Sequence, residues 1–207
     1  KEKKNLSKEQ IEEQLKYVGL DKVAIKGNRI LKKYPEVYLD FNSIAKGYGI
    51  DVIGRFLEDK KVENYLVEIG GEIRAKGTKP NKAPWTIKLT DPLGNGTGDG
   101  YKITNLSNKS MATSGNYLKY RISESGKKYV HTINPKTGEA LENNLLSVSV
   151  IASLDCADVD AYATAFMAMG LEKTLIFLNN RKDIKVILLY VNKNNELQEY
   201  TNYYFEE

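Results

Sequence analysis

The spacing of apolar and polar residues changes repeatedly along this chain of 207 residues, and each change predicts an element. Ser7 and Gln10 have the form of a capping box, and apolar residues at helical spacing then continue until Gly19, which predicts a short surface helix. Short alternating runs between residues 22 and 40 predict three small strands, the last of which ends at Asp40.

The middle and the end of the chain continue this alternation between strands and helices. Apolar residues within 44–57 have the spacing of an amphipathic helix, and residues 64–77 form two alternating runs joined by Gly-Gly. The last 36 residues of the sequence predict a helix over 172–179 and a closing β-hairpin around 194–195. Repeats of solenoid length are not visible, so the pattern does not predict a repeat protein.

The segment 151–178 joins a predicted strand to a predicted helix and carries a candidate metal site. Asp160 and Thr164 are four residues apart, so on a helix their side chains lie one turn above the other. A carboxylate and a hydroxyl in this arrangement can share a hard cation. In the alternative, both side chains have local roles. The Asp160 carboxylate lies in the first turn of the helix and interacts favourably with the helix dipole, and the Thr164 hydroxyl hydrogen-bonds to the backbone of its own helix.

The helix predicted over 44–57 begins directly after a turn of small residues. Its first turn leaves N–H groups unpaired, and Lys46 adds a cation, so this turn is a candidate anion site. A lysine near a helix N-terminus is disfavoured by the dipole, which favours a function for it, although surface lysines are common. Asp40 has the alternative of capping the entry to the helix.

Three further places carry candidate chemistry, each with a structural alternative. Gly70-Gly71 is typical of a tight hairpin, and less often of backbone that approaches a ligand. The turn predicted at 113–115 could donate hydrogen bonds from its hydroxyl groups, or be an ordinary Ser-Gly turn. His131 is the single histidine, so any imidazole chemistry depends on it, although a lone histidine is more often structural.

Composition narrows the classes of function. With 41% hydrophobic and 28% charged residues the chain reads as a globular protein, and we find no apolar run near the length of a membrane span. The formal charge of +4 is small and the lysines are scattered, so nucleic acid is not expected as a partner. The single cysteine, Cys156, excludes an internal disulfide and is expected to be buried packing.

Five segments of the sequence resemble the ApbE family, the FAD:protein FMN transferases once called thiamine biosynthesis lipoproteins. In chain order they are LDFNSIAKGYGID, NYLVEIGGEIRAKG, MATSGNY, HTINPKTGEAL and SVSVIASLDCADVDAYATAFMAMG. Any one of them would be weak, but five in the family's order, spread over about two thirds of the chain, form a specific pattern.

The resemblance implies an α+β fold of the ApbE type, a T-fold-like mixed sheet with packed helices in a single domain over residues 1–207. It implies a Mg²⁺-dependent enzyme that cleaves the pyrophosphate of FAD and transfers FMN onto a threonine or serine hydroxyl of a target protein. Typical targets are subunits of membrane redox complexes with a Ser/Thr-Gly-Ala-Ser/Thr acceptor sequence. Magnesium takes oxygen ligands and bridges phosphates, so few protein ligands suffice.

The resemblance also assigns roles to individual residues. The metal ligands are Asp160, Thr164 and a backbone carbonyl placed at Ser43. The flavin site is lined by Asp40, Lys46, Gly70, Gly71, Thr113, Ser114, Gly115, His131 and Ile133. As a hypothesis, His131 or Asp160 is the catalytic group that helps deprotonate the incoming hydroxyl, and the sequence does not separate these two roles.

The sequence departs from the family pattern in three places, and the resemblance also implies a cellular location. The chain is expected to be the C-terminal portion of a longer parent, without the N-terminal segment of full members. Family members usually have glycines where Asn42 and Ser43 stand, and Asn134 replaces a common aspartate. The family is usually exported and often lipid-anchored, so we expect an extracytoplasmic, membrane-associated parent.

The sequence leaves two other activities open. One is a Mg²⁺-dependent FAD pyrophosphatase that releases FMN and AMP with water as acceptor, and the other is a non-catalytic FAD-binding fragment. A purely structural α+β domain, in which the motif turns only shape the scaffold, is the remaining alternative. The identity of an acceptor protein cannot be deduced from the sequence.

Overall fold

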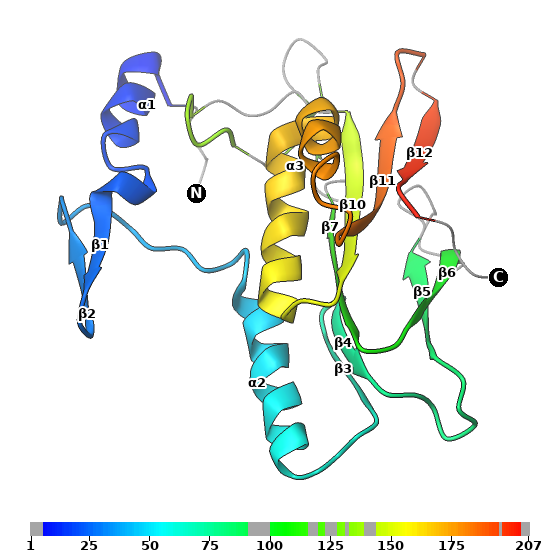
Figure 1. The fold of residues 1–207 in the computed structure, drawn as a ribbon. Coiled ribbons are helices and arrows are strands. Elements are labelled where there is room, and N and C mark those ends of the chain that lie inside the picture. Colours follow the sequence, from blue (N-terminus) through cyan, green and yellow to red (C-terminus); the bar gives the residue numbers. More distant parts are fainter. Residues whose placement is uncertain are drawn as a thin grey trace.

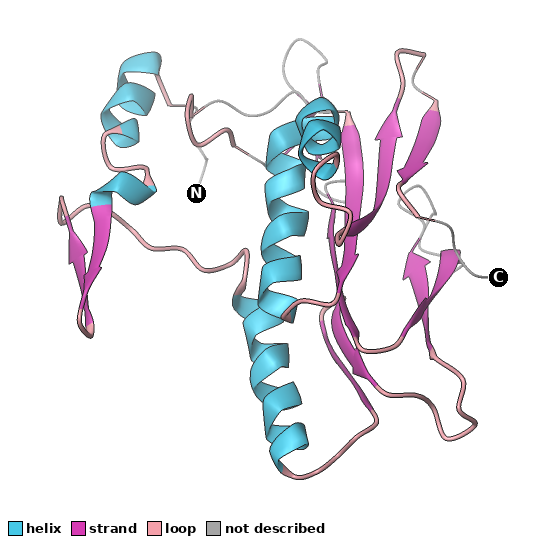
Figure 2. Ribbon diagram, viewed as in Figure 1, coloured by secondary structure: helices cyan, strands magenta, loops and turns pink. Residues whose placement is uncertain are grey.

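A six-stranded sheet, covered by helices on one face and by a β-ribbon on the other, forms the body of the protein (Figures 1 and 2). The computed structural model describes residues 6–90, 100–115, 120–122, 128–130, 133–138, 144–194 and 196–203. Its helices are α1 (Lys8–Leu15), α2 (Ala45–Asp59) and α3 (Cys156–Leu178), with a 3-10 turn at Leu20–Lys22. Its strands are β1 (Val23–Lys26), β2 (Arg29–Lys32), β3 (Tyr65–Ile69), β4 (Glu72–Lys76), β5 (Trp85–Thr90), β6 (Gly100–Leu106), β7 (Lys109–Gly115), β8 (Tyr120–Ile122), β9 (Lys128–Val130), β10 (Leu145–Ala152), β11 (Lys185–Val191) and β12 (Leu197–Thr201).

The main sheet has the strand order β12-β11-β10-β7-β4-β3, and its neighbouring strands pair antiparallel. In the register of β4 and β7, Ile73 lies opposite Met111, so residues before Ile73 and residues after Met111 share one end of the sheet. That end therefore holds both Gly70-Gly71 and Thr113. Helices on one face of an antiparallel sheet confirm the α+β prediction.

Two apolar clusters hold these layers together. The larger lies between α3 and the sheet and includes Val148, Val150, Phe166 and Met167, all nearly inaccessible to solvent. The second lies on the opposite face, where the paired strands β5 and β6 cover residues such as Met111. The alternation of strand side chains explains both clusters, since successive residues of β7 and β10 face opposite sides.

Helix α3 is interrupted near its end. Gly170 has φ 77° and ψ 172°, which breaks the helical path between the long first part and a short last part that matches the helix predicted over 172–179. By length and composition α3 could cross a membrane, contrary to our expectation that no apolar run approaches that length. Its apolar residues pack on the sheet and its path breaks at Gly170, which is typical of the core helix of a globular protein.

The local predictions are partly confirmed. Ser7 and Gln10 form the reciprocal capping box of α1, and β11 pairs with β12 as the closing hairpin. The strand predicted to end at Asp40 is wrong, since residues 37–40 have no regular secondary structure. The backbone carbonyls of Pro35 and Val37 accept hydrogen bonds from Lys32 Nζ at 2.6 and 2.8 Å. The turn predicted around 113–115 is also wrong, since these residues complete strand β7 between β4 and β10.

Candidate active site

The Asp160 carboxylate joins the two helices that cover the sheet. Asp160 lies in the second turn of α3 with 3% of its surface exposed, and its Oδ2 accepts a hydrogen bond from the backbone N–H of Gly47 in α2 at 3.1 Å. Burial raises the pKa of Asp160, while the Gly47 amide and the nearby Lys46 charge lower it. The carboxylate therefore makes a tertiary contact, and the purely local alternative does not describe it.

Lys46, the neighbour of Gly47, extends toward the start of β4. Its ammonium group lies 2.5 Å from Glu72 Oε2 and 3.4 Å from the backbone oxygen of Gly70. Glu72 is 1% exposed, and burial raises the pKa of its carboxyl, opposed by Lys46 and supported by the negative charge of Asp160. Lys46, Glu72 and Asp160 thus form one electrostatic cluster beneath the first turn of α2.

The backbone just before α2 contributes a further oxygen. Gly47 is the third residue of α2, so its amide is one of the first-turn N–H groups without a partner in the helix, and it donates to Asp160. Among the hydrogen bonds of the described residues, none ends at the Ser43 carbonyl. A carbonyl without an amide partner therefore lies close along the chain to the residue that contacts Asp160.

The two hydroxyl residues near the end of β7 lie on opposite faces of the sheet. Ser114 Oγ lies 3.3 Å from Thr164 Oγ1, one turn along α3 from Asp160. Thr113 Oγ1 lies 2.8 Å from Ser149 Oγ on the neighbouring strand. Successive strand residues alternate in this way, so Ser114 joins the helix side with Asp160, whereas Thr113 does not.

Thr113 instead borders a hollow of about 480 Å³ on the face opposite the helices, between the sheet and β5. Ile73, Met111 and Leu189 form part of its apolar lining, and Gly70-Gly71 also lines it. Gly70 and Gly71 have φ of 60° and 103°, so they form the tight turn of the β3–β4 hairpin, where residues with a Cβ would be strained.

Other predicted site residues lie apart from this cluster or beyond what the structure describes. Asp40 is exposed and accepts hydrogen bonds from the backbone and side-chain N–H groups of Asn42, at 2.7 and 3.1 Å. Ile133 is 59% exposed, and Gly115 ends β7 as an exposed residue. His131 lies outside the described residues, so its predicted catalytic role stays a prediction.

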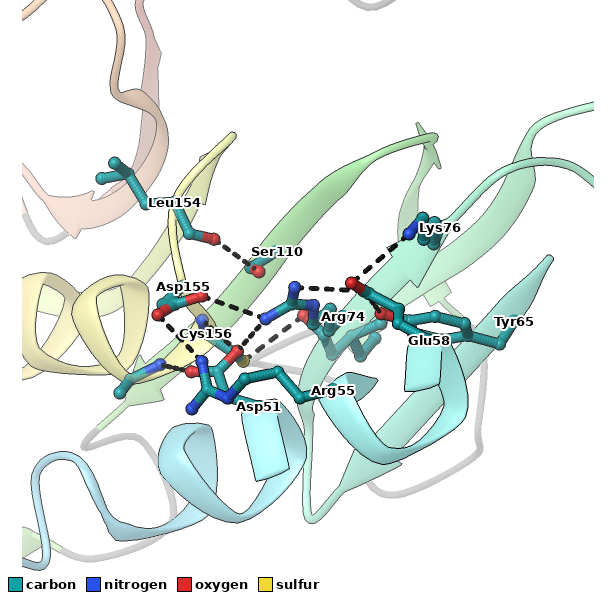
Figure 3. A network of polar contacts seen from close by, with 12 residues as sticks. Asp51, Arg55, Glu58, Tyr65, Arg74, Lys76, Ser110, Leu154, Asp155 and Cys156 are labelled. Atoms are coloured by element: carbon teal, nitrogen blue, oxygen red, sulfur yellow. Dashed lines mark hydrogen bonds and ion pairs between the residues drawn. The ribbon is translucent and has the colours of Figure 1, made fainter. Parts of the chain in front are cut away.

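Sequence reasoning missed a second polar network at the start of α3 (Figure 3). Asp51 of α2 is fully buried and accepts hydrogen bonds from the backbone N–H groups of Cys156 and Ala157, both at 2.9 Å. Arg74 donates to Asp51 at 2.6 Å and to Asp155 at 3.0 Å. Because Asp51 accepts two of the first amides of α3, it acts as an N-cap supplied by another helix.

Cys156 lies in the same network and is structural, as the sequence indicated. It is fully buried, and its thiol lies 3.5 Å from the carbonyl oxygen of Ile73. Burial, followed by the charges of Asp51 and Asp160, raises the pKa of this thiol to about 12. A thiol in this environment stays protonated and is a poor nucleophile.

The close crossing of α2 and α3 depends on a glycine, which gives a first prediction. A Cβ at Gly47 would collide with the carbonyl oxygen of Cys156 and lie 2.7 Å from Ala157 Cα, both rigid backbone atoms. We expect Gly47→Ala to destabilise the protein by about 1–3 kcal/mol, because overpacking forces the helices apart. The midpoint of urea unfolding measures this change.

Gly49→Ala is the matched control for the Gly47 variant. Gly49 lies in the same helix, but a Cβ there would meet only Ile69 Cδ1 at an ordinary 3.6 Å. Alanine is the better helix former, so this variant is expected to be unchanged or more stable by about 0.5–1 kcal/mol. Equal destabilisation by both alanines would show that the α2–α3 crossing does not require Gly47.

Comparison with known proteins gives one consistent result. A model of the ApbE family matches residues 1–188. The FAD:protein FMN transferase of Haemophilus influenzae is 39% identical over 171 residues, which cover 81% of this chain and 49% of that protein. Its counterpart in Vibrio cholerae serotype O1 is 39% identical over 155 residues, 75% of this chain and 46% of that protein.

Comparison of the fold with solved structures also finds ApbE flavin transferases. The crystal structure of the Pseudomonas stutzeri flavinyl transferase ApbE in its apo form is similar with a TM-score of 0.83 and 33% identity. The similarity covers 96% of this chain and 60% of that chain. The chain spans about half the length of the curated relatives that it matches.

Proposed function

This chain belongs to the ApbE family, and from that premise we propose that it carries the metal and phosphate side of an FAD:protein FMN transferase site. The relatives that it matches over three quarters or more of its length bear that name. The proposed substrates are FAD and an acceptor protein with a Ser/Thr-Gly-Ala-Ser/Thr sequence. The acceptor we expect is a subunit of a membrane redox complex.

The observation that carries this proposal is the cluster of Asp160, Lys46 and Glu72 at one end of the sheet. A phosphate ester requires a cationic partner, and Lys46 supplies one beside the carboxylates of Glu72 and Asp160. Asp160, buried and held by the Gly47 amide, supplies a fixed anionic oxygen next to that cation. An anionic and a cationic group held together in this way suit a phosphate that is bound with a metal ion.

The donor atoms in this region fit magnesium. Asp160 would hold the ion together with the Ser43 carbonyl and the Thr164 hydroxyl, an all-oxygen set of the kind that Mg²⁺ prefers. Within the described residues, no three His, Cys, Asp or Glu side chains come close enough to hold an ion by themselves. Such a site would need neutral oxygens, water and the substrate phosphates to complete it, and magnesium sites commonly use them. When bound, the ion would neutralise negative charge on the phosphates.

In the proposed reaction the acceptor hydroxyl oxygen forms a bond to the phosphorus of the FMN half. The anhydride P–O bond breaks, AMP leaves with its electron pair, and the hydroxyl proton passes to a base. His131 and Asp160 are the candidates for that base. Lys46 would donate to a phosphate oxygen and help hold the diphosphate in place.

A mass-spectrometric assay tests this proposal and is our second prediction. The chain is mixed with FAD, Mg²⁺ and a domain carrying the acceptor sequence, and the intact mass of the acceptor is measured. We expect the acceptor to gain the mass of FMN less one water, only when Mg²⁺ is present. An acceptor whose Ser/Thr is replaced by alanine and a reaction containing EDTA are the controls.

The other outcomes separate the alternatives. Metal-dependent release of FMN and AMP without an adduct would contradict transfer and favour the pyrophosphatase. FAD binding without either product would favour a flavin-binding fragment. If neither product forms and FAD does not bind, the proposed function is wrong for this chain.

A further inference from the structure

Glu72 is a buried carboxylate with few partners among the described residues. It begins β4 directly after the Gly70-Gly71 turn, on the face covered by α2, and only 1% of its surface is exposed. Its Oε2 atom is buried without a hydrogen bond that meets normal geometry, although the Lys46 ammonium lies 2.5 Å away. Burying a carboxylate with few partners costs free energy, so Glu72 is a candidate for a role besides stability.

Asp51 shows what a structural carboxylate in the same protein looks like. It is also fully buried, but it accepts hydrogen bonds from two backbone amides of α3 and from Arg74. That set satisfies both of its oxygens and joins α2 to α3. The backbone group that acts on the Glu72 carboxyl is its own amide, and its charged partner is an exposed lysine of α2. Glu72 thus lacks the set of partners that holds Asp51.

The residue that Glu72 contacts, Lys46, has one more N–H donor than it has acceptors nearby in the part of the chain that the structure describes. An ammonium group has three N–H donors, and two acceptors are present, Glu72 Oε2 and the backbone oxygen of Gly70. No third acceptor for this ammonium occurs among the described residues. The Lys46 side chain is 44% exposed, so the remaining donor can reach a ligand from solvent. The two fixed contacts restrict a side chain that is otherwise among the most flexible.

We propose that Glu72 is a positioning residue, which holds the Lys46 ammonium beside Asp160 so that its third N–H donates to a diphosphate oxygen of FAD. The inference rests on the proposed function, since it names the group that prepares the lysine of that site. Holding the lysine in advance reduces the conformational entropy that binding must remove. Glu72 acts through Lys46 and does not itself touch the substrate.

The first test measures Lys46 without any flavin. The intact chain is treated with a limiting amount of an amine-acylating reagent, and modification of each lysine is followed by peptide mass spectrometry. Because the contacts with Glu72 and the Gly70 carbonyl restrict the motion of the Lys46 side chain, we expect Glu72→Gln to speed modification of Lys46 by about tenfold. Lys61, which is exposed, is the internal reference, and Glu63→Gln, at an exposed glutamate, is the matched control variant.

The second test is a double-mutant cycle on FAD binding, measured by flavin fluorescence with EDTA present so that metal does not contribute. Glu72→Gln and Lys46→Met are each expected to raise the Kd for FAD by about tenfold. The double variant is expected to match Lys46→Met, because Glu72 has no effect once the lysine is absent. Thermal unfolding checks that Glu72→Gln stays folded, and we expect its Tm to be unchanged or higher.

Each outcome decides the inference. Faster modification of Lys46 in Glu72→Gln, with no further loss of affinity in the double variant, would support it. Unchanged Lys46 modification, or losses that multiply in the double variant, would overturn it, the latter by showing that Glu72 acts independently of Lys46. If the wild-type chain does not bind FAD either with EDTA or with Mg²⁺, the proposed function fails, and the labelling result alone decides whether Glu72 positions Lys46.

Discussion

Asp160→Asn is expected to lower Mg²⁺-dependent turnover of FAD by about a thousandfold while the protein stays folded. The carboxamide keeps an oxygen that can accept the Gly47 N–H, so the contact between α2 and α3 survives. What is lost is the negative charge that would hold the metal ion. A metal ion contributes several kcal/mol of charge stabilisation in the transition state, and each 1.36 kcal/mol is about a tenfold change in rate.

The measurement is the initial rate of FMN or AMP formation over a range of Mg²⁺ concentrations. Asp158→Asn is the control, because Asp158 lies two residues earlier on the same helix and is exposed. Replacing a buried carboxylate whose pKa is raised by burial should leave Tm unchanged or increase it. Turnover at the normal rate in Asp160→Asn would show that the metal site lies elsewhere.

Asp51→Ala is expected to destabilise the protein by about 3–5 kcal/mol, the largest effect on stability that we predict. The change leaves Arg74 without its closest buried partner and leaves two amides at the start of α3 without an acceptor. Each unsatisfied buried group adds to the loss. The free energy of unfolding in urea, read from fluorescence of the single tryptophan, measures it.

Asp59→Ala is the matched control, since Asp59 is an exposed aspartate near the end of the same helix. A surface substitution of this kind usually changes stability by less than about 0.5 kcal/mol. If Asp51→Ala were no more destabilising than Asp59→Ala, the network in Figure 3 would not be what anchors α3.

Local signals in the sequence predicted the elements that depend on near neighbours. The capping box at Ser7, the hairpin at Gly70-Gly71 and the closing hairpin of β11 and β12 all follow from residues a few positions apart. The turn expected at 113–115 was wrong because small hydroxyl residues are typical of turns, whereas here they pair with strand β10. Pairing between distant strands is decided by tertiary contacts that local propensity does not contain.

In the candidate site, too, local patterns predicted some residues, and residues that depend on tertiary contacts were missed. Spacing alone brought Asp160 and Thr164 to one side of a helix, and the family motifs pointed to Lys46. Glu72 was missed because polar residues that alternate with apolar ones in a strand normally indicate a face in water. Asp51, in helix α2, was missed because its contacts are with the start of α3, 105 residues further along the chain. In β4, Glu72 and Arg74 do share such a face, but α2 covers it. The signal that could have drawn attention to Glu72 is an acid directly after a tight Gly-Gly turn.

The contacts between α2 and α3 also determine when the site can form during folding. The Gly47–Asp160 bond joins residues 113 positions apart, and the Asp51–Cys156 bond joins residues 105 apart. Closing loops of that length is entropically unfavourable, and contacts distant in sequence form slowly. Both helices can therefore form while Asp160 and Lys46 remain apart. The site exists only once these long-range contacts have formed, so binding at this site reports tertiary folding and not helix content.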